Sequence, residues 1–133
     1  MPDTNSAHIL VIDDDEVDVM FVQRELNKLN VPFNFHVARN GVEALSQLQD
    51  HDKALMMPKI IVLDLMMPKM NGIEFLKELR AQTKFDFITV LVLTTSNNER
   101  DRIATDELRV DGYFVKDKQF EDFIDHCKHL LTK

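Results

Sequence analysis

The sequence predicts an α/β fold, a doubly wound sheet of five parallel strands with helices on both faces. Two observations lead to this class. Five short apolar runs alternate with five segments whose apolar residues recur at helical spacing, which is typical of parallel strands joined by right-handed helical connections. The run Ile60–Leu63 is apolar throughout, as in a strand buried on both faces, and it stops at the carboxylate of Asp64.

The five expected strands cover residues 8–12, 31–38, 59–64, 87–93 and 112–115. The second has a different pattern from the others. Its apolar residues Phe33, Phe35 and Val37 alternate with the polar Asn34 and His36, which predicts a strand buried on one face only.

The five expected helices cover residues 17–29, 41–48, 71–80, 97–108 and 120–131. In the second, Val42, Leu45 and Leu48 are expected on one buried face, and Asn40 is expected to cap the first turn. In the last, Cys127 lies in the apolar stripe and is expected in the core.

The composition limits the possible functions. The chain has 133 residues, 44% of them hydrophobic and 29% charged, enough for one domain with one core. A formal net charge of -7 argues against sequence-independent nucleic-acid binding, which requires a basic surface. A single cysteine excludes an intramolecular disulfide. The polar N-terminus is not a signal peptide and no stretch approaches transmembrane length, so we expect a cytoplasmic protein.

Polar and charged residues stand at the ends of the expected strands. Asp13 and Asp14 end the first strand, Asp64 the third, Thr94 the fourth and Lys116 the fifth. Because the strands are parallel, these residues meet at one edge of the sheet. Three carboxylates in close contact require a cation, and an all-oxygen ligand set suits Mg²⁺. With one ammonium and one hydroxyl beside them, they predict a phosphoryl-transfer site.

The chain resembles the receiver domain of two-component response regulators. The segments that carry the resemblance are Ile9–Asp15, Val62–Pro68, Val92–Ser96 and Tyr113–Lys116. They follow in the family's order and at its spacing, and together they span almost the whole chain. The resemblance implies the flavodoxin-like strand order 2-1-3-4-5 and a phosphorylation-dependent signalling switch.

The resemblance also implies roles for the acidic residues. Asp64 would be the phosphoacceptor, and Asp13 and Asp14 the family's acid pair. The cofactor would be Mg²⁺ or Mn²⁺, with Asp14, Asp64 and the backbone carbonyl of Met66 as direct ligands. Asp13 would act through a metal-bound water.

Further roles follow for residues around the acceptor. Thr94 and Lys116 would bind the phosphoryl oxygens, while Pro68 and Gly72 would shape the loop after the acceptor. On phosphorylation Thr94 would move inward and Tyr113 would turn into the vacated space. Tyr113 could equally be a residue that packs on the edge of the sheet.

Two features depart from the common receiver pattern. Asp117 follows Lys116 where many receivers have a proline after a cis peptide, and a cis bond without proline costs about 2.5–4 kcal/mol. The connection Gln49–Pro58 is longer than in the shortest receivers. This lengthening is similar to that of stand-alone receivers linked to bacteriophytochromes.

We expect residues 1–133 to form a single receiver domain with an ordered core at about 7–131 and no output domain. The implied phosphodonor is a sensor histidine kinase or a histidine phosphotransfer protein. The output would be contact with a protein target or a second copy of the chain, as a monomer or a phosphorylation-dependent homodimer, without nucleic acid or membrane. The expected contact face comprises Asn97–Leu108, Tyr113 and the last helix.

Three other functions fit parts of the sequence. A haloacid dehalogenase type of phosphotransferase usually carries a second aspartate two residues after the nucleophile, where this chain has Met66. A flavin-binding module would need a Gly-, Ser- or Thr-rich phosphate loop after the first strand. A signalling adaptor that is never phosphorylated is favoured only by the pair Lys116–Asp117. We therefore expect a signalling domain and not an enzyme with a free substrate.

Several of these residues also have simpler structural interpretations. Asp15 is expected to cap the first helix, and Ser96 could cap the fourth. His126 and His129 lie one helical turn apart but lack an evident third ligand, so we expect them to be solvated.

Overall fold

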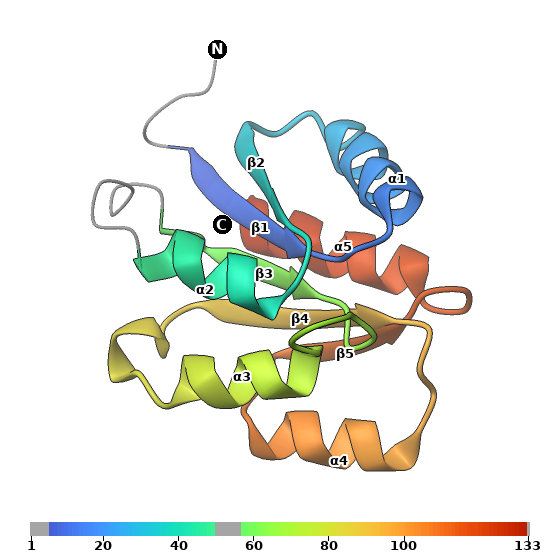
Figure 1. Ribbon diagram of the computed structural model, residues 1–133. Helices are drawn as coiled ribbons and strands as arrows, with labels where there is room; N and C mark the ends of the chain where they lie inside the picture. The colour runs from blue at the N-terminus through green and yellow to red at the C-terminus, as the bar shows by residue number, and fades with distance from the viewer. Residues whose placement is uncertain (1–5, 50–56, 133) are drawn as a thin grey trace.

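The computed structural model describes residues 6–49 and 57–132 (Figure 1). Its elements are β1 (Ala7–Ile12), α1 (Glu16–Asn27), β2 (Phe33–Ala38), α2 (Gly41–Gln49), β3 (Ile60–Leu63), α3 (Gly72–Arg80), a 3₁₀ helix (Thr83–Phe85), β4 (Thr89–Thr94), α4 (Glu99–Glu107), β5 (Gly112–Val115) and α5 (Phe120–Leu131). Most of the long connection expected at Gln49–Pro58 lies outside the described residues. Within the described segments, no helix is long and apolar enough to cross a bilayer.

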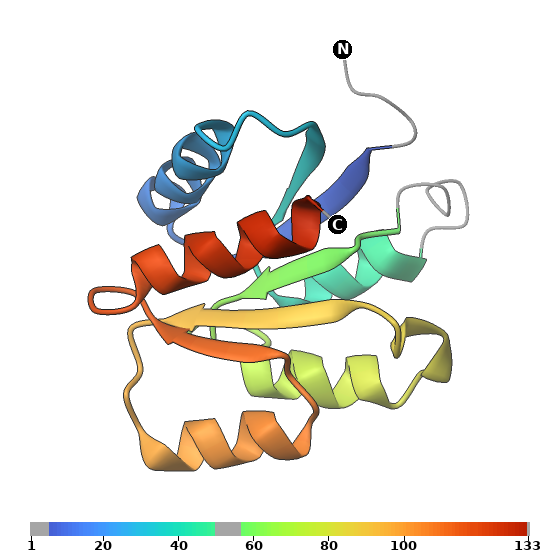
Figure 2. The same ribbon diagram turned by 180° about the vertical axis from the view of Figure 1, so that it is seen from behind.

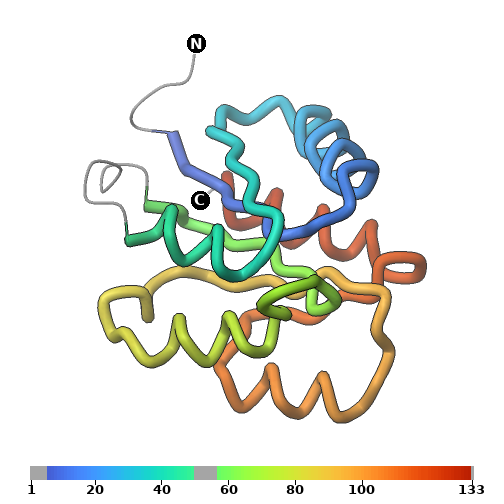
Figure 3. Tube along the Cα trace, viewed as in Figure 1, coloured from blue at the N-terminus to red at the C-terminus, as the bar shows by residue number. Residues whose placement is uncertain are grey.

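The sheet has the predicted topology. Its strand order is β2-β1-β3-β4-β5, and every pairing is parallel. Ile12 pairs with Leu63 and Leu63 with Val92, so the central strands end nearly level. The loops that follow β1, β3, β4 and β5 therefore gather at one edge of the sheet, on the right in Figure 3.

The sheet divides the core into two clusters because successive residues of a strand point to opposite faces. Leu10 and Ile61 face the cluster covered by α2 and α3, which lie toward the viewer in Figure 1. Ile9 and Val62 face the cluster covered by α1 and α5, which lie in front in Figure 2. Burial on both faces explains why the central strands are continuous apolar runs.

Side-chain caps fix the first turns of the helices that border the strand ends. The carboxylate of Asp15 accepts hydrogen bonds from the amides of Val17 and Asp18, which confirms it as the cap of α1. Asn40 accepts from the Glu43 amide in the same way. The predicted cap at Ser96 is wrong, because the residue that caps α4 is Asn98.

Two expectations about burial are wrong. Val42 is 53% exposed, and the buried residues of α2 are Gly41, Ala44 and Leu48. Gly41 lets α2 pack closely against the loop between β3 and α3, because a Cβ at this position would lie 2.7 Å from the Met70 side chain. Asn34, expected on the polar face of β2, is buried, and its amide donates to the Ser6 carbonyl.

The fourth strand begins later than expected. The 3₁₀ helix Thr83–Phe85 places Phe85 fully in the core, and Phe87 is exposed before β4 starts at Thr89. The two phenylalanines have the same hydropathy, so periodicity does not distinguish them.

The buried thiol of Cys127 predicts a pH dependence of stability. Burial raises the pKa of Cys127 from its ordinary value of 9.0 to about 12. The unfolded thiol therefore ionises first, so its contribution to stability is complete below about pH 9 and declines by roughly 1.4 kcal/mol per pH unit above it. Urea unfolding of the wild type and of Cys127→Ala between pH 7.5 and 10.5 would measure this. The stability difference between them should shrink as pH rises, and a constant difference contradicts the assignment.

Candidate phosphoacceptor and metal site

Three carboxylates lie together where β1 and β3 end. Asp13 and Asp14 follow β1, and Asp64 follows the neighbouring β3. One oxygen from each lies within 4.8 Å of the others. Asp13 and Asp64 are buried, whereas Asp14 is exposed. The cluster is therefore open to solvent on one side only.

The chain itself orients two of these carboxylates. Asp13 Oδ1 accepts a hydrogen bond of 2.9 Å from the Asp15 amide, and Asp64 Oδ1 accepts one of 3.2 Å from the Met66 amide. The second oxygen of each carboxylate, Oδ2, faces the ammonium of Lys116. Each carboxylate thus has one oxygen held by its own loop and one directed into the site.

Lys116 supplies the positive charge of the cluster. Its Nζ lies 2.9 Å from Asp13 Oδ2 and 3.6 Å from Asp64 Oδ2. A third carboxylate, Asp18 on α1, lies at 2.7 Å and is the nearest of the three. Burial by itself lowers the pKa of Lys116, but the hydrogen bonds to Asp18 and Asp13 outweigh it and raise the pKa.

Sequence analysis missed Asp18. Its place in the first turn of the helix that directly follows Asp13 and Asp14 is the signal that could have identified it.

The turn at Lys116–Asp117 places the lysine correctly without proline. No peptide bond among the described residues is cis, so this bond is trans. The Lys116 amide donates to the Thr94 carbonyl at 2.8 Å and anchors the turn to the end of β4. The replacement of proline by Asp117 therefore leaves Lys116 within reach of the acidic cluster.

The cluster is short of positive charge. Burial raises the pKa of Asp13 to about 6, against the opposing effects of the Asp15 amide and of Lys116. One ammonium faces three carboxylates, and Asp14 adds a fourth. Because all the donor atoms are oxygens, the site fits a hard divalent cation.

Among the described residues, Asp13, Asp14 and Asp64 form the only group of three acidic, histidine or cysteine side chains close enough together to hold a metal ion. His129 is exposed as expected, but His126 is half-buried, with its ring 5.9 Å from that of Phe114.

Thr94 and Tyr113 both contact the loop after β4. Thr94 is fully buried, and its hydroxyl oxygen accepts a hydrogen bond of 3.3 Å from the Ser96 amide. The Tyr113 hydroxyl donates to the Ser96 carbonyl at 3.0 Å, and the Arg102 guanidinium lies 4.6 Å from the ring centroid. Ser96 also donates to Asp101 at 2.6 Å.

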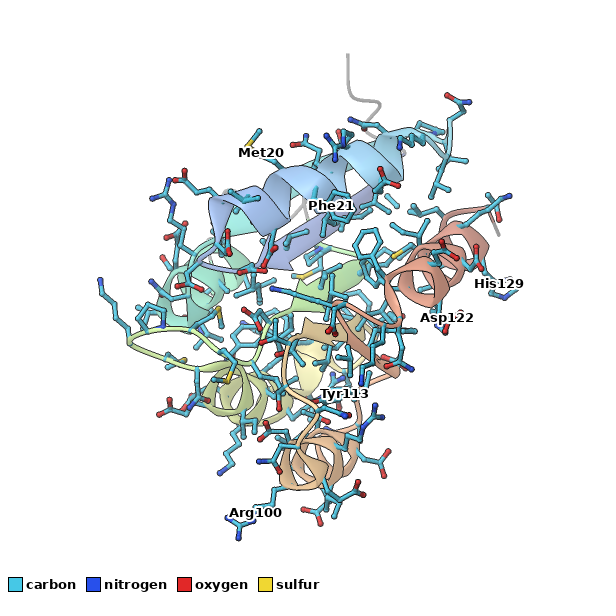
Figure 4. All side chains as sticks on the ribbon, turned by 90° about the vertical axis from the view of Figure 1, so that its right-hand side faces the viewer. Met20, Phe21, Arg100, Tyr113, Asp122 and His129 are labelled. Carbon is cyan, nitrogen blue, oxygen red and sulfur yellow. The ribbon has the colours of Figure 1, made fainter. Side chains whose placement is uncertain are left out.

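Figure 4 looks onto the edge that carries the site. There Tyr113 lies between α4, marked by Arg100, and α5, marked by Asp122, while Met20 and Phe21 lie on α1. The Tyr113 ring is half-buried and lies between the acidic cluster and helix α4.

A glycine closes the loop between Asp64 and α3. The Gly72 amide donates to the Leu65 carbonyl at 3.1 Å, which folds the loop back onto the end of β3. A Cβ at Gly72 would lie 2.7 Å from the Asp64 carbonyl oxygen and from Leu65 Cα. This close approach of two backbone segments confirms that Gly72 shapes the loop.

Comparison with known proteins identifies the class. Residues 9–128 match the response regulator receiver domain. The chain belongs to this family of phosphorylation-controlled signalling domains, whose phosphodonors are histidine kinases, and it is not a turnover enzyme.

Rcp1, RcpA and RtBRR are among the response regulators that are similar to the chain. Rcp1 of Synechocystis is 35% identical over 116 residues, covering 86% of this chain and 79% of that protein. The structure of its Mn²⁺-bound form has a TM-score of 0.80 at 32% identity, with 93% of this chain and 91% of the other covered.

The other two are phytochrome response regulators. The structure of phosphorylated cyanobacterial RcpA has a TM-score of 0.81 at 30% identity, and the alignment covers 94% of this chain and 91% of RcpA. The bacteriophytochrome response regulator RtBRR has a TM-score of 0.78 at 32% identity, with 94% and 78% covered. The predicted family and its similarity to phytochrome-associated receivers are confirmed.

Gly72→Ala should destabilise the chain by about 1–3 kcal/mol, because the added methyl group meets backbone that cannot move aside. Gly41→Ala is the matched control, since its Cβ meets the flexible side chain of Met70. Urea unfolding of both variants would compare the losses. A loss of stability in Gly72→Ala no larger than that in Gly41→Ala would contradict the predicted backbone clash at Gly72.

Mg²⁺ should stabilise the wild type by binding the folded acidic cluster, by about 1.4 kcal/mol at ten times its dissociation constant. Asp14→Asn removes one carboxylate of the cluster and should abolish most of the rise in melting temperature. Asp122→Asn, an exposed change on α5, should retain the rise. Thermal melts with Mg²⁺ and with EDTA would measure it, and an unaltered rise in Asp14→Asn would exclude Asp14 as a ligand.

Proposed function

We propose that this chain is a signalling switch in which Asp64 accepts a phosphoryl group from the histidine of a kinase or phosphotransfer protein. One observation carries the assignment. Asp64 is the buried strand-end carboxylate that faces Lys116 at 3.6 Å and also shares the acidic cluster with Asp13 and Asp14. Asp13 shares these neighbours, but it follows β1, whereas Asp64 follows β3, the middle strand of the five.

The transfer follows from the arrangement of these groups. Asp64 Oδ2, the oxygen not held by the Met66 amide, attacks phosphorus in line with the leaving imidazole nitrogen. A P–O bond forms while the P–N bond breaks, and the nitrogen keeps the electron pair. Lys116 then moves from its carboxylate partners to the transferred phosphoryl oxygens, where its charge is needed. The Thr94 hydroxyl donates a hydrogen bond to another phosphoryl oxygen.

The proposed cofactor is Mg²⁺ or Mn²⁺, held by Asp14, Asp64 and the Met66 carbonyl, with Asp13 acting through a bound water. When bound, such a cation would neutralise charge on the transferring group. The Mn²⁺-bound form of Rcp1 supports this choice of metal.

Met66 fits this role and argues against a phosphatase. Met66 is 62% exposed, and the group that it could offer to a hard cation is its backbone carbonyl, because a thioether is a soft ligand. A haloacid dehalogenase type of enzyme usually has a general acid here, and a thioether has no proton to donate.

The output would pass through Tyr113. Movement of Thr94 toward the phosphoryl group would break the hydrogen bond from the Ser96 amide to the Thr94 hydroxyl oxygen. The Ser96 carbonyl also accepts the hydrogen bond of the Tyr113 hydroxyl, so Tyr113 would be affected. The ring could then leave its place beside Arg102 and change the surface formed by α4, β5 and α5. The alternative, that Tyr113 only packs on the edge of the sheet, predicts no movement.

The partners would be proteins. The kinase is proposed to be of the phytochrome type, because RcpA and RtBRR are phytochrome response regulators. The downstream partner would be a protein target or a second copy of the chain. A net charge of -7 makes a nucleic-acid duplex a poor partner at physiological salt.

Incubation with acetyl phosphate and Mg²⁺ should add one phosphoryl group to the wild type, as measured by intact mass. Asp64→Asn should abolish the adduct because it removes the nucleophile, whereas Asp122→Asn should keep it. An adduct at full yield in Asp64→Asn would exclude Asp64 as the acceptor.

Tyrosine fluorescence of the same samples reports on Tyr113, the only tyrosine, and an unchanged signal favours the packing role.

A further inference from the structure

Lys116 is not centred on the proposed acceptor. Its Nζ lies 2.7 Å from Asp18 and 2.9 Å from Asp13, but 3.6 Å from Asp64, beyond hydrogen-bonding distance. The lysine is therefore displaced toward α1. The residue that displaces it, Asp18, stands outside the cluster suited to a cation, which comprises Asp13, Asp14 and Asp64.

The surroundings of Asp18 strengthen its contact with Lys116. Both residues line a cavity of about 210 Å³ whose walls include Phe21, Leu93 and Phe120. The rings of Phe21 and Phe120 lie 4.7 Å apart. Apolar walls exclude part of the solvent, and the ion pair is screened less than a pair on an open surface.

Removal of the Asp18 charge would change the balance of forces on the ammonium. Its remaining partners among the described residues would be Asp13 and Asp64, the oxygens that a cation also needs. Lys116 would then close on Asp64 Oδ2 and compete with the cation and the phosphodonor for the same lone pairs.

We propose that Asp18 is a positioning residue that holds Lys116 beside α1 and short of Asp64, leaving the acceptor carboxylate open to the divalent cation. The role in phosphoryl transfer rests on the proposed function, whereas the effect on cation binding does not. Asp18 thus tunes the metal site without being a ligand.

The first test measures Mg²⁺ binding alone by isothermal titration calorimetry. Asp18→Asn keeps the shape of the side chain and removes its charge, and the dissociation constant of Mg²⁺ should rise about three- to tenfold. Asp18→Glu, which keeps the carboxylate, should stay within about twofold of the wild type. Melting temperatures in EDTA verify that each variant is folded.

Two controls separate positioning from a simple loss of charge. Asp117→Asn removes a charge from the same cavity but not from a partner of Lys116, and it should change the dissociation constant by less than about twofold. In a Lys116→Met background, Asp18→Asn should also have less than about a twofold effect, because its influence acts through the lysine. An equal loss with and without Lys116 overturns the proposal.

The second test follows the rate of phosphorylation by acetyl phosphate. For Asp18→Asn, the rate should fall at limiting Mg²⁺ and return to the wild-type value at saturating Mg²⁺, when the cation excludes Lys116 from Asp64. A loss that persists at saturation overturns the proposal. If the wild type forms no adduct on Asp64, the proposed function fails, while the Mg²⁺ titrations still decide the role of Asp18.

Discussion

The ammonium of Lys116 is the charge on which the carboxyl edge of the sheet depends. Two buried carboxylates, Asp13 and Asp64, would be costly to ionise side by side without it. The lysine compensates them only in part, because it also pairs with Asp18. Burial raises the pKa of Asp13 to about 6, and the Asp15 amide and Lys116 oppose this rise only in part. The same excess of carboxylates favours the binding of a hard divalent cation at this edge.

The strand register of the sheet brings these charged groups together. Each strand is apolar where both faces are covered and becomes polar where it leaves the core, so the change in sequence character marks the edge of the sheet. Adjacent β1 and β3 end nearly level, which brings Asp13 close to Asp64 from a distant part of the chain. Thr94 and Lys116 are joined by the hydrogen bond between β4 and the turn after β5. Backbone register therefore sets the position of each group, and side-chain rotamers make only the final adjustment.

The sequence predicted the strand order through the family resemblance, and the meeting of strand ends through the rule for parallel sheets. It failed where two residues of like character have different environments. Phe85 is buried and Phe87 is exposed, because a 3₁₀ helix that hydropathy periodicity does not predict ends at Phe85 and a turn follows it. Val42 is exposed because α2 packs through Gly41 and Ala44, and a small residue gives little signal in a hydropathy pattern. Asp18 was missed because its partner lies on another element, and an acidic residue in a first turn already has an explanation in the helix dipole.

Ser96 is a junction between three elements that the sequence assigns to separate tasks. Its amide donates to Thr94, its carbonyl accepts from Tyr113, and its hydroxyl joins Asp101 in the first turn of α4 and accepts from the Asn98 amide. A single residue with three occupied polar groups cannot satisfy one partner in a new position while keeping the others in place. The end of β4, the Tyr113 ring and the first turn of α4 are therefore connected through one residue, and we expect a movement of Thr94 to reach α4 through Ser96.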